Sequence, residues 1–196
     1  MKWIGLTGGI ATGKSTASRL IQSLDIPVID ADHISHQMTK FGADGYHSVV
    51  SHFGMDILKP DLEIDRKKLA EIVFQNPHKK KQLEEILHPL IHAEVERQKN
   101  QFEKQGHRLC FYDVPLLFEN NLQEQFDSVV LVWCDLQTQL ERLMKRNKLT
   151  EEEALLRIRN QQPLSQKVYG SDYCLDNSGT ELNLIQLVDY LVAQLG

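Results

Sequence analysis

Residues 8–15 read Gly-Gly-Ile-Ala-Thr-Gly-Lys-Ser and satisfy the phosphate-loop pattern G-x-x-x-x-G-K-[ST]. The apolar run at residues 3–6 comes directly before this stretch, and residues 15–24 carry a helical pattern. Glycines let a loop between a strand and a helix curl until successive N–H groups point into one concavity, and the positive end of the helix adds to that field. The stretch therefore predicts a binding site for the phosphates of a nucleotide rather than an ordinary glycine-rich turn.

Each position of this loop has an expected role toward ATP. Lys14 would reach the β- and γ-phosphates and take part in catalysis, and the Ser15 hydroxyl would hold Mg²⁺. Thr16 would add a contact to the α-phosphate. The residues that we expect to contact ATP from this stretch are Gly8, Gly9, Ala11, Thr12, Gly13, Lys14, Ser15 and Thr16.

Five short runs of the chain have the character of buried strands, because several of them are almost continuously apolar rather than alternating. They are residues 2–7, 27–30, 108–113, 128–134 and 172–176. Helical patterns separate them, as in a doubly wound sheet. We therefore predict an α/β fold, a three-layer P-loop NTPase sandwich with a five-stranded parallel sheet.

Two helical segments are longer than a simple crossover between parallel strands requires. By analogy with small P-loop kinases, residues 33–106 are expected to form a helical insertion that binds the acceptor, and residues 135–170 a helical lid. The nucleotide-binding core would then comprise residues 1–32, 107–134 and 171–196. Within the insertion, His88-Pro89 is expected to interrupt and kink a helix.

Carboxylates follow two of the expected strands. Asp113 ends the run 109–113 in the manner of a Walker B strand and is expected to hold Mg²⁺, directly or through water. Asp30 and Asp32 end the second strand, where ligands of open α/β sheets bind. A carboxylate there suits a hydroxyl acceptor, whose proton it can take, so Asp32 is the expected base with Asp30 in support. The alternative is that Asp32 only caps a helix starting at His33.

Basic side chains in the expected lid can stabilise the charge that develops during phosphoryl transfer. Arg142 and Arg146 lie one helical turn apart, and we expect Arg142 to act in catalysis and Arg146 to bind ATP. Arg157 and Arg159 are further candidates for contacts to phosphate or adenine. The opposing interpretation is an ordinary solvated helix face. His88 and His92 have i,i+4 spacing but no third ligand, so a structural or acceptor contact is favoured over a metal site.

Composition excludes several classes of protein. The formal net charge is −5, which disfavours a nucleic-acid-binding protein, and no apolar run approaches the roughly 20 residues needed to cross a bilayer. The N-terminal apolar stretch is too short for a signal peptide. Cys110, Cys134 and Cys174 show no metal-ligand spacing and are expected to be buried in a reducing compartment. We expect a cytoplasmic protein, either a monomer or a weak homo-oligomer.

Together these motifs resemble the dephospho-coenzyme A kinase family. The matching segments are 5–10, 12–15, 28–32, 88–91, 113–119, 142–146, 157–158, residue Gln161 and 176–179, so the resemblance covers essentially the whole chain. The run Asp-Val-Pro-Leu-Leu-Phe-Glu at 113–119 is far more specific to this family than the phosphate loop, which many families share. Where family members often carry several basic residues, residues 167–172 keep only Lys167.

The resemblance implies transfer of the γ-phosphate of ATP to the ribose 3′-hydroxyl of dephospho-coenzyme A, with Mg²⁺ as cofactor. It places Asn177 near the nucleotide base. It also implies that the acceptor is contacted by Asp30, Asp32, His88 and Leu116. The hydroxyl acceptor agrees with the argument from Asp30 and Asp32.

Two other functions compete with this interpretation. A hydroxyl kinase of the shikimate or gluconate type would share the phosphate loop and the second-strand carboxylate, but the long insertion at 33–106 favours a bulkier acceptor. A nucleotide-binding regulator without catalysis would have no use for the acids at Asp32 and Asp113. Kinases whose acceptor group is itself a phosphate, such as adenylate kinases, need arginines to hold that anion, whereas this chain has the acid pair Asp30 and Asp32.

Overall fold

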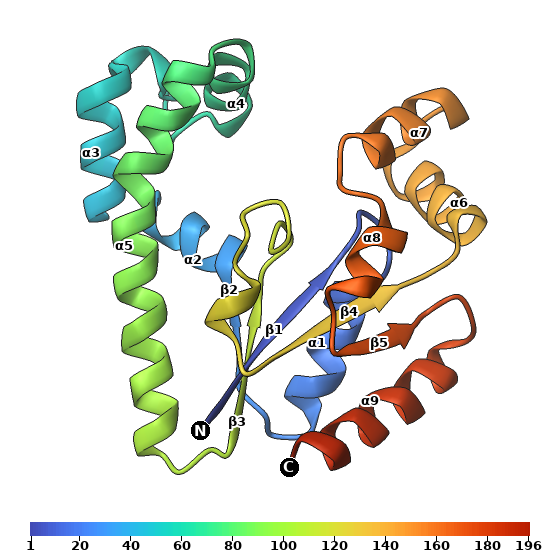
Figure 1. Ribbon diagram of the computed structural model, residues 1–196. Helices are drawn as coiled ribbons and strands as arrows, with labels where there is room; N and C mark the ends of the chain where they lie inside the picture. Colours follow the sequence, from blue (N-terminus) through green and yellow to red (C-terminus); the bar gives the residue numbers. More distant parts are fainter. The chain divides into compact units, whose positions relative to one another are not determined.

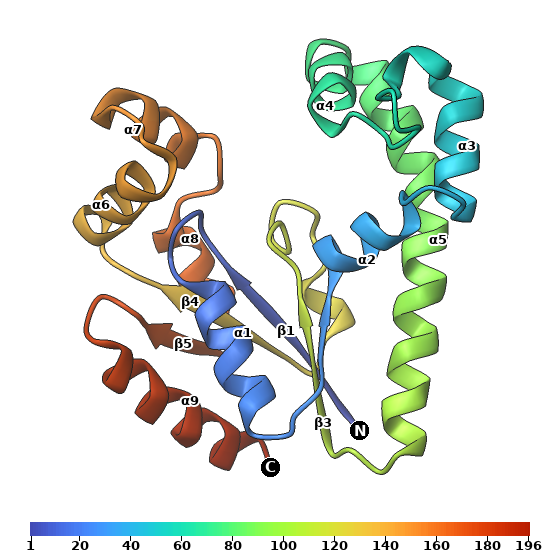
Figure 2. The same cartoon turned by 180° about the vertical axis from the view of Figure 1, so that it is seen from behind.

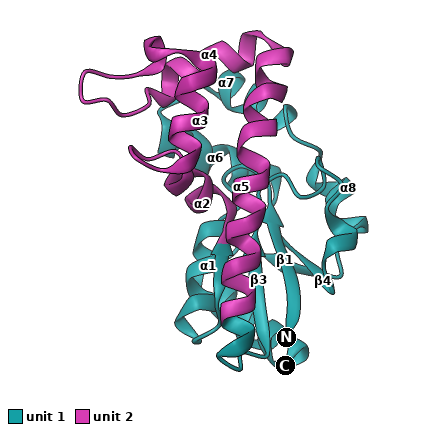
Figure 3. Cartoon of the chain, turned by 90° about the vertical axis from the view of Figure 1, so that its left-hand side faces the viewer, with its two compact units in different colours: residues 1–29, 102–196 teal, residues 30–101 magenta.

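The chain forms two compact units, residues 1–29 with 102–196, and residues 30–101 (Figure 3). The structure is a computed structural model that describes all residues, 1–196. No helix of the chain combines the length and the apolar character that crossing a bilayer requires. The division into core, insertion and lid stays a prediction.

The first unit is built on a five-stranded sheet in the order β2-β3-β1-β4-β5 (Figure 1). Its strands are β1 (Lys2–Gly8), β2 (Val28–Asp30), β3 (Leu109–Asp113), β4 (Ser128–Trp133) and β5 (Tyr173–Asp176). The pairs β1–β3, β1–β4 and β4–β5 are parallel. The predicted α/β fold is confirmed, and each strand differs from its expected range by at most one residue at either end.

Helices α1 (Lys14–Ser23) and α9 (Glu181–Leu195) lie side by side over one face of this sheet (Figure 2). They cover it because their apolar residues recur at helical spacing, as at Ile21 in α1 and at Leu184 and Val188 in α9. These side chains pack on Leu6 and Phe111 from the central strands, and all five are almost completely buried. This cluster is the main core of the unit, and it anchors both ends of the loop at residues 8–13.

A second group of helices in the first unit follows β4. It comprises α6 (Leu136–Asn147), α7 (Glu151–Arg159) and α8 (Leu164–Tyr169). Asp135 caps α6, and Thr150 with Glu153 forms the capping box that the sequence predicts for α7. The two helices pack on each other through Leu143 and Ala154, which are fully buried. We refer to α6 and α7 as the helical hairpin.

The second unit is helical. It contains α2 (Ala31–Met38), α3 (Asp44–Phe53), the 3₁₀ turn η1 (Met55–Ile57), α4 (Arg66–Gln75) and most of α5 (Pro77–Lys104). Its own core gathers Val49, Ile57 and Leu69, all of them buried. The expectation that Pro89 interrupts a helix is wrong, because α5 is continuous through it. Proline removes one N–H donor, and the turns on either side retain the rest of the ladder.

The cysteines only partly follow the expected burial. Cys110 and Cys134 are buried, whereas Cys174 is exposed. Cys174 lies in β5, at the edge of the sheet, and its neighbour Leu175 takes the buried side of that strand. Alternation along an edge strand therefore turns the thiol toward solvent.

We predict that Leu184→Ala destabilises the first unit by about 2–5 kcal/mol, because Leu184 is fully buried against the sheet and truncation leaves a cavity. Urea unfolding followed by circular dichroism measures the change. The matched control is Leu182→Ala on the same helix, where the side chain is 63% exposed, and its effect should stay within about 0.5 kcal/mol. Equal effects of the two substitutions would contradict the packing described for α9.

Candidate functional site

The phosphate loop connects β1 to α1 through two residues with left-handed backbone. Ala11 has φ 60° and Gly13 has φ 91°. Thr12 closes the bend, because its hydroxyl donates to the Gly9 carbonyl at 3.0 Å and its N–H donates to the same oxygen at 3.3 Å. No side chain caps the N-terminus of α1, so the first N–H groups of that helix are available to an anion.

Gly13 is required at its position for two independent reasons. Its left-handed backbone disfavours any side chain, and a Cβ there would lie 2.0 Å from Nδ2 of Asn177. Asn177, which follows β5 and is 7% exposed, donates from Nδ2 to the Thr12 carbonyl at 2.8 Å. The structure therefore places Asn177 against the phosphate loop at Thr12 and Gly13.

Lys14 and Asp113 form an ion pair at the start of α1. The parallel register aligns Asp113 with Leu6, two residues before the phosphate loop begins, which brings the end of β3 beside the loop. Asp113 is almost completely buried, and Lys14 is 18% exposed. The residues predicted to act on phosphate and on the metal are thus brought together by strand pairing.

Ser15 and Asp113 fit the ligand set that Mg²⁺ takes beside a nucleotide. Mg²⁺ prefers oxygen ligands and is usually held by one or two protein groups together with phosphates and water. No cluster of three or more His, Cys, Asp or Glu side chains that could hold a metal is present in the chain. The hydroxyl of Ser15 on the exposed first turn of α1 and the carboxylate of Asp113 are oxygen donors of the required kind.

The two hairpin arginines have different surroundings. Arg142 lies near the phosphate loop, with Nη1 at 3.9 Å from the position that a Cβ of Gly13 would occupy. This nitrogen is buried and has no hydrogen-bond partner, which is costly for a guanidinium unless an anion is supplied. Arg146 is exposed and donates from Nε to the side-chain oxygen of Asn147 at 2.9 Å. Arg142 is therefore the arginine that the structure brings to the loop.

Burial raises the pKa of the Cys134 thiol to about 11, and the charge of Arg142 only partly opposes this effect. Cys134 comes directly after β4, at the foot of the hairpin. A thiol with such a pKa stays protonated at neutral pH and is a poor nucleophile.

Three of the predicted acceptor residues belong to the second unit. Asp30 is the N-cap of α2, and its carboxylate accepts the His33 N–H at 2.8 Å. The helix begins at Ala31, so the alternative in which Asp32 caps a helix starting at His33 is wrong. Asp32 instead lies in the first turn of α2 and is exposed. His88 is exposed on α5.

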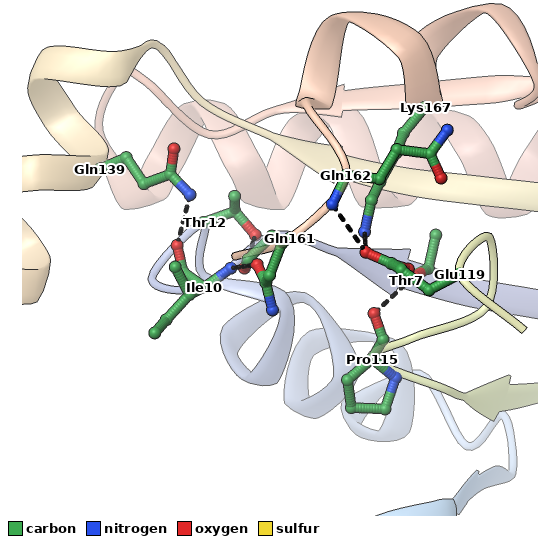
Figure 4. A network of polar contacts seen from close by, with 10 residues as sticks. Thr7, Ile10, Thr12, Pro115, Glu119, Gln139, Gln161, Gln162 and Lys167 are labelled. Atoms are coloured by element: carbon green, nitrogen blue, oxygen red, sulfur yellow. Dashed lines mark hydrogen bonds and ion pairs between the residues drawn. The ribbon is translucent and has the colours of Figure 1, made fainter. Parts of the chain in front are cut away.

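The segment after β3 contains the remaining predicted acceptor residue, Leu116, which is 43% exposed. The same segment carries Glu119, which binds Lys167 of α8 at 2.8 Å and accepts the Gln162 N–H at 3.1 Å (Figure 4). Lys167 is fully buried. The one basic residue left at 167–172 therefore ties α8 to this segment.

Sequence reasoning missed two glutamines that contact the phosphate loop. Gln139 of α6 donates to the carbonyl of Ile10, and the carboxamide oxygen of Gln161 accepts its N–H, each at 2.7 Å (Figure 4). In the sequence, Gln161 stands out only as one of the residues that carry the family resemblance. Gln139 is polar yet 3% exposed and sits within the apolar stripe of α6, a combination that can mark a side chain held by the backbone of another segment.

This fold and site define a P-loop kinase. The family model for dephospho-CoA kinase matches residues 2–183. The chain belongs to the dephospho-CoA kinase family, which confirms the resemblance seen in the sequence.

Curated relatives and solved structures agree with this assignment. The dephospho-CoA kinase of Bdellovibrio bacteriovorus is 45% identical over 195 residues, covering 100% of this chain and 96% of its own. That of Bacillus cereus is 48% identical over 177 residues, covering 90% and 88%. The solved dephospho-CoA kinase of Campylobacter jejuni is 31% identical, with a TM-score of 0.73, over 98% of this chain and 96% of its own. A shikimate kinase of Acinetobacter baumannii, at 18% identity and a TM-score of 0.55, shares the fold.

We predict that Gly13→Ala weakens ATP binding by at least about tenfold, because the added Cβ meets Asn177 and distorts the loop around the helix N-terminus. Isothermal titration calorimetry with ATP measures this effect. Gly42→Ala is the matched control, since Gly42 also has a left-handed backbone, at φ 83°, but has open space around it. Its Cβ should cost about 1–2 kcal/mol of stability and leave ATP binding unchanged. Unchanged binding in Gly13→Ala would contradict the described geometry.

The cysteines give a prediction about pH. With a pKa of about 11, roughly one Cys134 thiol in a thousand is ionised at pH 8, and the thiolate is the reactive form. Burial also raises the pKa of Cys174, but this thiol is accessible. Iodoacetamide labelling read by peptide mass spectrometry should modify Cys174 first, and Cys134 should react only as the pH rises toward 11 or the chain unfolds. If Cys134 were labelled faster than Cys174 at pH 8, the Cys134 thiol would not be buried as the structure shows.

Proposed function

We propose that this protein transfers the γ-phosphate of ATP to the ribose 3′-hydroxyl of dephospho-coenzyme A, giving coenzyme A and ADP, the last step of coenzyme A synthesis. The observation that carries the proposal is the family match over residues 2–183, which includes both the phosphate loop and the segment 113–119. A kinase of this type places little covalent chemistry on the protein, so positioning and electrostatic stabilisation account for its rate.

ATP binding rearranges one ion pair in this proposal. Lys14 and Asp113 neutralise each other before nucleotide arrives. Lys14 would then be drawn to the β- and γ-phosphates, and Asp113 with Ser15 would hold the Mg²⁺ that accompanies ATP. When bound, Mg²⁺ neutralises charge on the phosphate oxygens. The buried Nη1 of Arg142 gains the anionic partner that it lacks, at the phosphate that is being transferred.

The phosphate acceptor is a hydroxyl, and its reaction gains from a carboxylate that orients it and takes its proton. Asp32 is the proposed base. Asp30 is the weaker candidate, because its carboxylate already accepts the N–H that caps α2. Asp30, His88 and Leu116 are proposed to contact the acceptor, and Arg146 and Asn177 the ATP.

The competing functions have less support. Shikimate kinases share the fold at low identity, and fold alone does not carry an acceptor. A regulator without catalysis would retain nucleotide binding and would not need Asp32. We propose further that the enzyme works in the cytoplasm as a monomer or weak homo-oligomer, without nucleic-acid or membrane partners.

The test is turnover of Mg-ATP by purified protein with dephospho-coenzyme A, shikimate, gluconate or AMP as the acceptor. Of the four acceptors, we expect only dephospho-coenzyme A to support ADP formation at an enzymatic rate. Absence of turnover with that acceptor overturns the proposal, and ATP binding without turnover of any acceptor would favour the regulator.

Asp32→Asn should lower kcat by about 10²–10⁴-fold, the usual contribution of a general base, with little change in the KM for ATP. The matched control is Asp44→Asn, which changes an acidic residue in the first turn of α3 in the same way and should leave kcat near wild type. If Asp32→Asn keeps wild-type turnover, Asp32 is not the base. In that case Asp30→Asn tests whether Asp30 is the base, because an asparagine at this position still caps α2.

A further inference from the structure

Ile10, near the tip of the phosphate loop, is held at both of its peptide hydrogen-bonding groups by side chains. Its carbonyl accepts from Nε2 of Gln139, and its N–H donates to Oε1 of Gln161, both at 2.7 Å (Figure 4). We call these two hydrogen bonds the Ile10 clamp. Gln139 comes from α6, and Gln161 follows α7, so the clamp joins the helical hairpin to the phosphate loop.

Apolar contacts accompany the clamp. The side chains of Ile10 and Ala11 pack on the cluster formed within the hairpin by Leu140, Leu143 and Ala154. The tip of the loop is therefore attached to α6 and α7 through both its backbone and its side chains. A shift of either helix would therefore change the contacts that hold the loop.

The backbone next to the clamp is strained. Ala11 adopts a left-handed conformation, with φ 60°, which disfavours any residue with a Cβ. Such a conformation persists only where surrounding contacts determine it. Because Ile10 is the preceding residue and both of its peptide groups are fixed, the clamp is placed to keep Ala11 in this conformation.

Hydrogen bonding, rather than dense packing alone, fixes the two carboxamides. The two glutamines, with Gly9 and Pro163, are among the residues that line a cavity of about 320 Å³. Side chains that border a cavity keep a single orientation when specific partners hold them.

The residue after Gln161 extends the connection to the segment that follows β3. The N–H of Gln162 donates to Glu119, which in turn binds the buried Lys167 (Figure 4). Thr7, at the end of β1, donates from its hydroxyl to the Pro115 carbonyl of the same segment at 3.3 Å. Consecutive residues 161 and 162 thus connect the phosphate loop and the segment 114–119.

We infer that Gln139 and Gln161 are positioning residues that hold the phosphate loop in the shape that accepts the nucleotide phosphates. They act through the peptide groups of Ile10 and do not themselves bind the nucleotide. The hairpin that carries Arg142 and the loop that binds phosphate are coupled by these bonds. The inference deepens the proposed function, since it concerns the ATP site of that kinase, but its test is nucleotide binding without acceptor.

The two glutamines allow an internally controlled experiment, because one donates to Ile10 and the other accepts from it. Gln139→Glu replaces the donor with a carboxylate facing a carbonyl oxygen, so the bond is lost. Gln161→Glu adds the same charge but keeps an acceptor for the Ile10 N–H. Gln166→Glu, on the exposed surface of α8, is the control for charge alone.

Isothermal titration calorimetry with ATP should give a Kd at least about tenfold weaker for Gln139→Glu, roughly 1.4 kcal/mol, and within about threefold of wild type for Gln161→Glu and Gln166→Glu. Equal weakening by Gln139→Glu and Gln161→Glu would show that added charge, not the hydrogen bond, is responsible. No weakening by Gln139→Glu would show that the loop keeps its shape without the clamp. Either result overturns the inference.

A second comparison keeps the test valid if Gln139→Glu fails to fold. Gln161→Met removes the acceptor without adding charge, and it should weaken ATP binding more than Gln161→Glu does. A charge effect predicts the opposite order. In steady-state turnover, Gln161→Met should raise the KM for ATP severalfold while the KM for the acceptor stays unchanged, and a general loss of structure would alter both constants. If wild-type protein binds ATP but phosphorylates no acceptor, the proposed function fails while this inference remains measurable.

Discussion

The N–H groups at the start of α1 have no capping side chain, and the phosphate loop must stay curved around them for an anion to bind there. That curvature requires left-handed backbone at Ala11 and at Gly13, of which only Gly13 adopts it without strain. Surrounding contacts supply the remaining constraint. Asn177 holds the loop at the Thr12 carbonyl, and the Ile10 clamp holds it two residues earlier.

The charged groups at the site are only partly paired before any ligand binds. Lys14 at the start of α1 is paired with Asp113 at the end of β3, whereas the buried Nη1 of Arg142 has no hydrogen-bond partner. A triphosphate with its metal ion can satisfy all three groups, since it offers anionic oxygens to the two cations and a cation to the carboxylate. The electrostatic pattern of the ligand-free protein therefore complements Mg-ATP rather than a neutral ligand.

Most of the fold could be predicted from the sequence because local patterns determine it. Buried parallel strands are nearly continuous apolar runs, and the phosphate loop and the capping box at Thr150 depend on a few residues at fixed spacing. The interruption expected at Pro89 does not occur, because the loss of a single N–H donor leaves the rest of the ladder of α5 in place. Cys174 was misjudged because the position of β5 at the sheet edge is a tertiary property.

The supporting contacts of the site were harder to predict because they, too, depend on tertiary structure. Gln139 and Ile10 are 129 positions apart in the sequence, and Glu119 and Lys167 meet only because α8 returns beside the segment after β3. No local spacing reveals such pairs. A polar residue inside an apolar helical stripe was the available signal for Gln139, and it indicated burial without indicating the partner.

The central claim is that this chain phosphorylates one hydroxyl of one nucleotide-like acceptor at the expense of ATP. The most direct measurement is ³¹P NMR of the product formed from dephospho-coenzyme A, together with the amount of ADP released. The account predicts a new phosphomonoester at the ribose 3′ position and one ADP for each molecule formed. A phosphate at any other position, or ADP released without phosphorylated product, would contradict it.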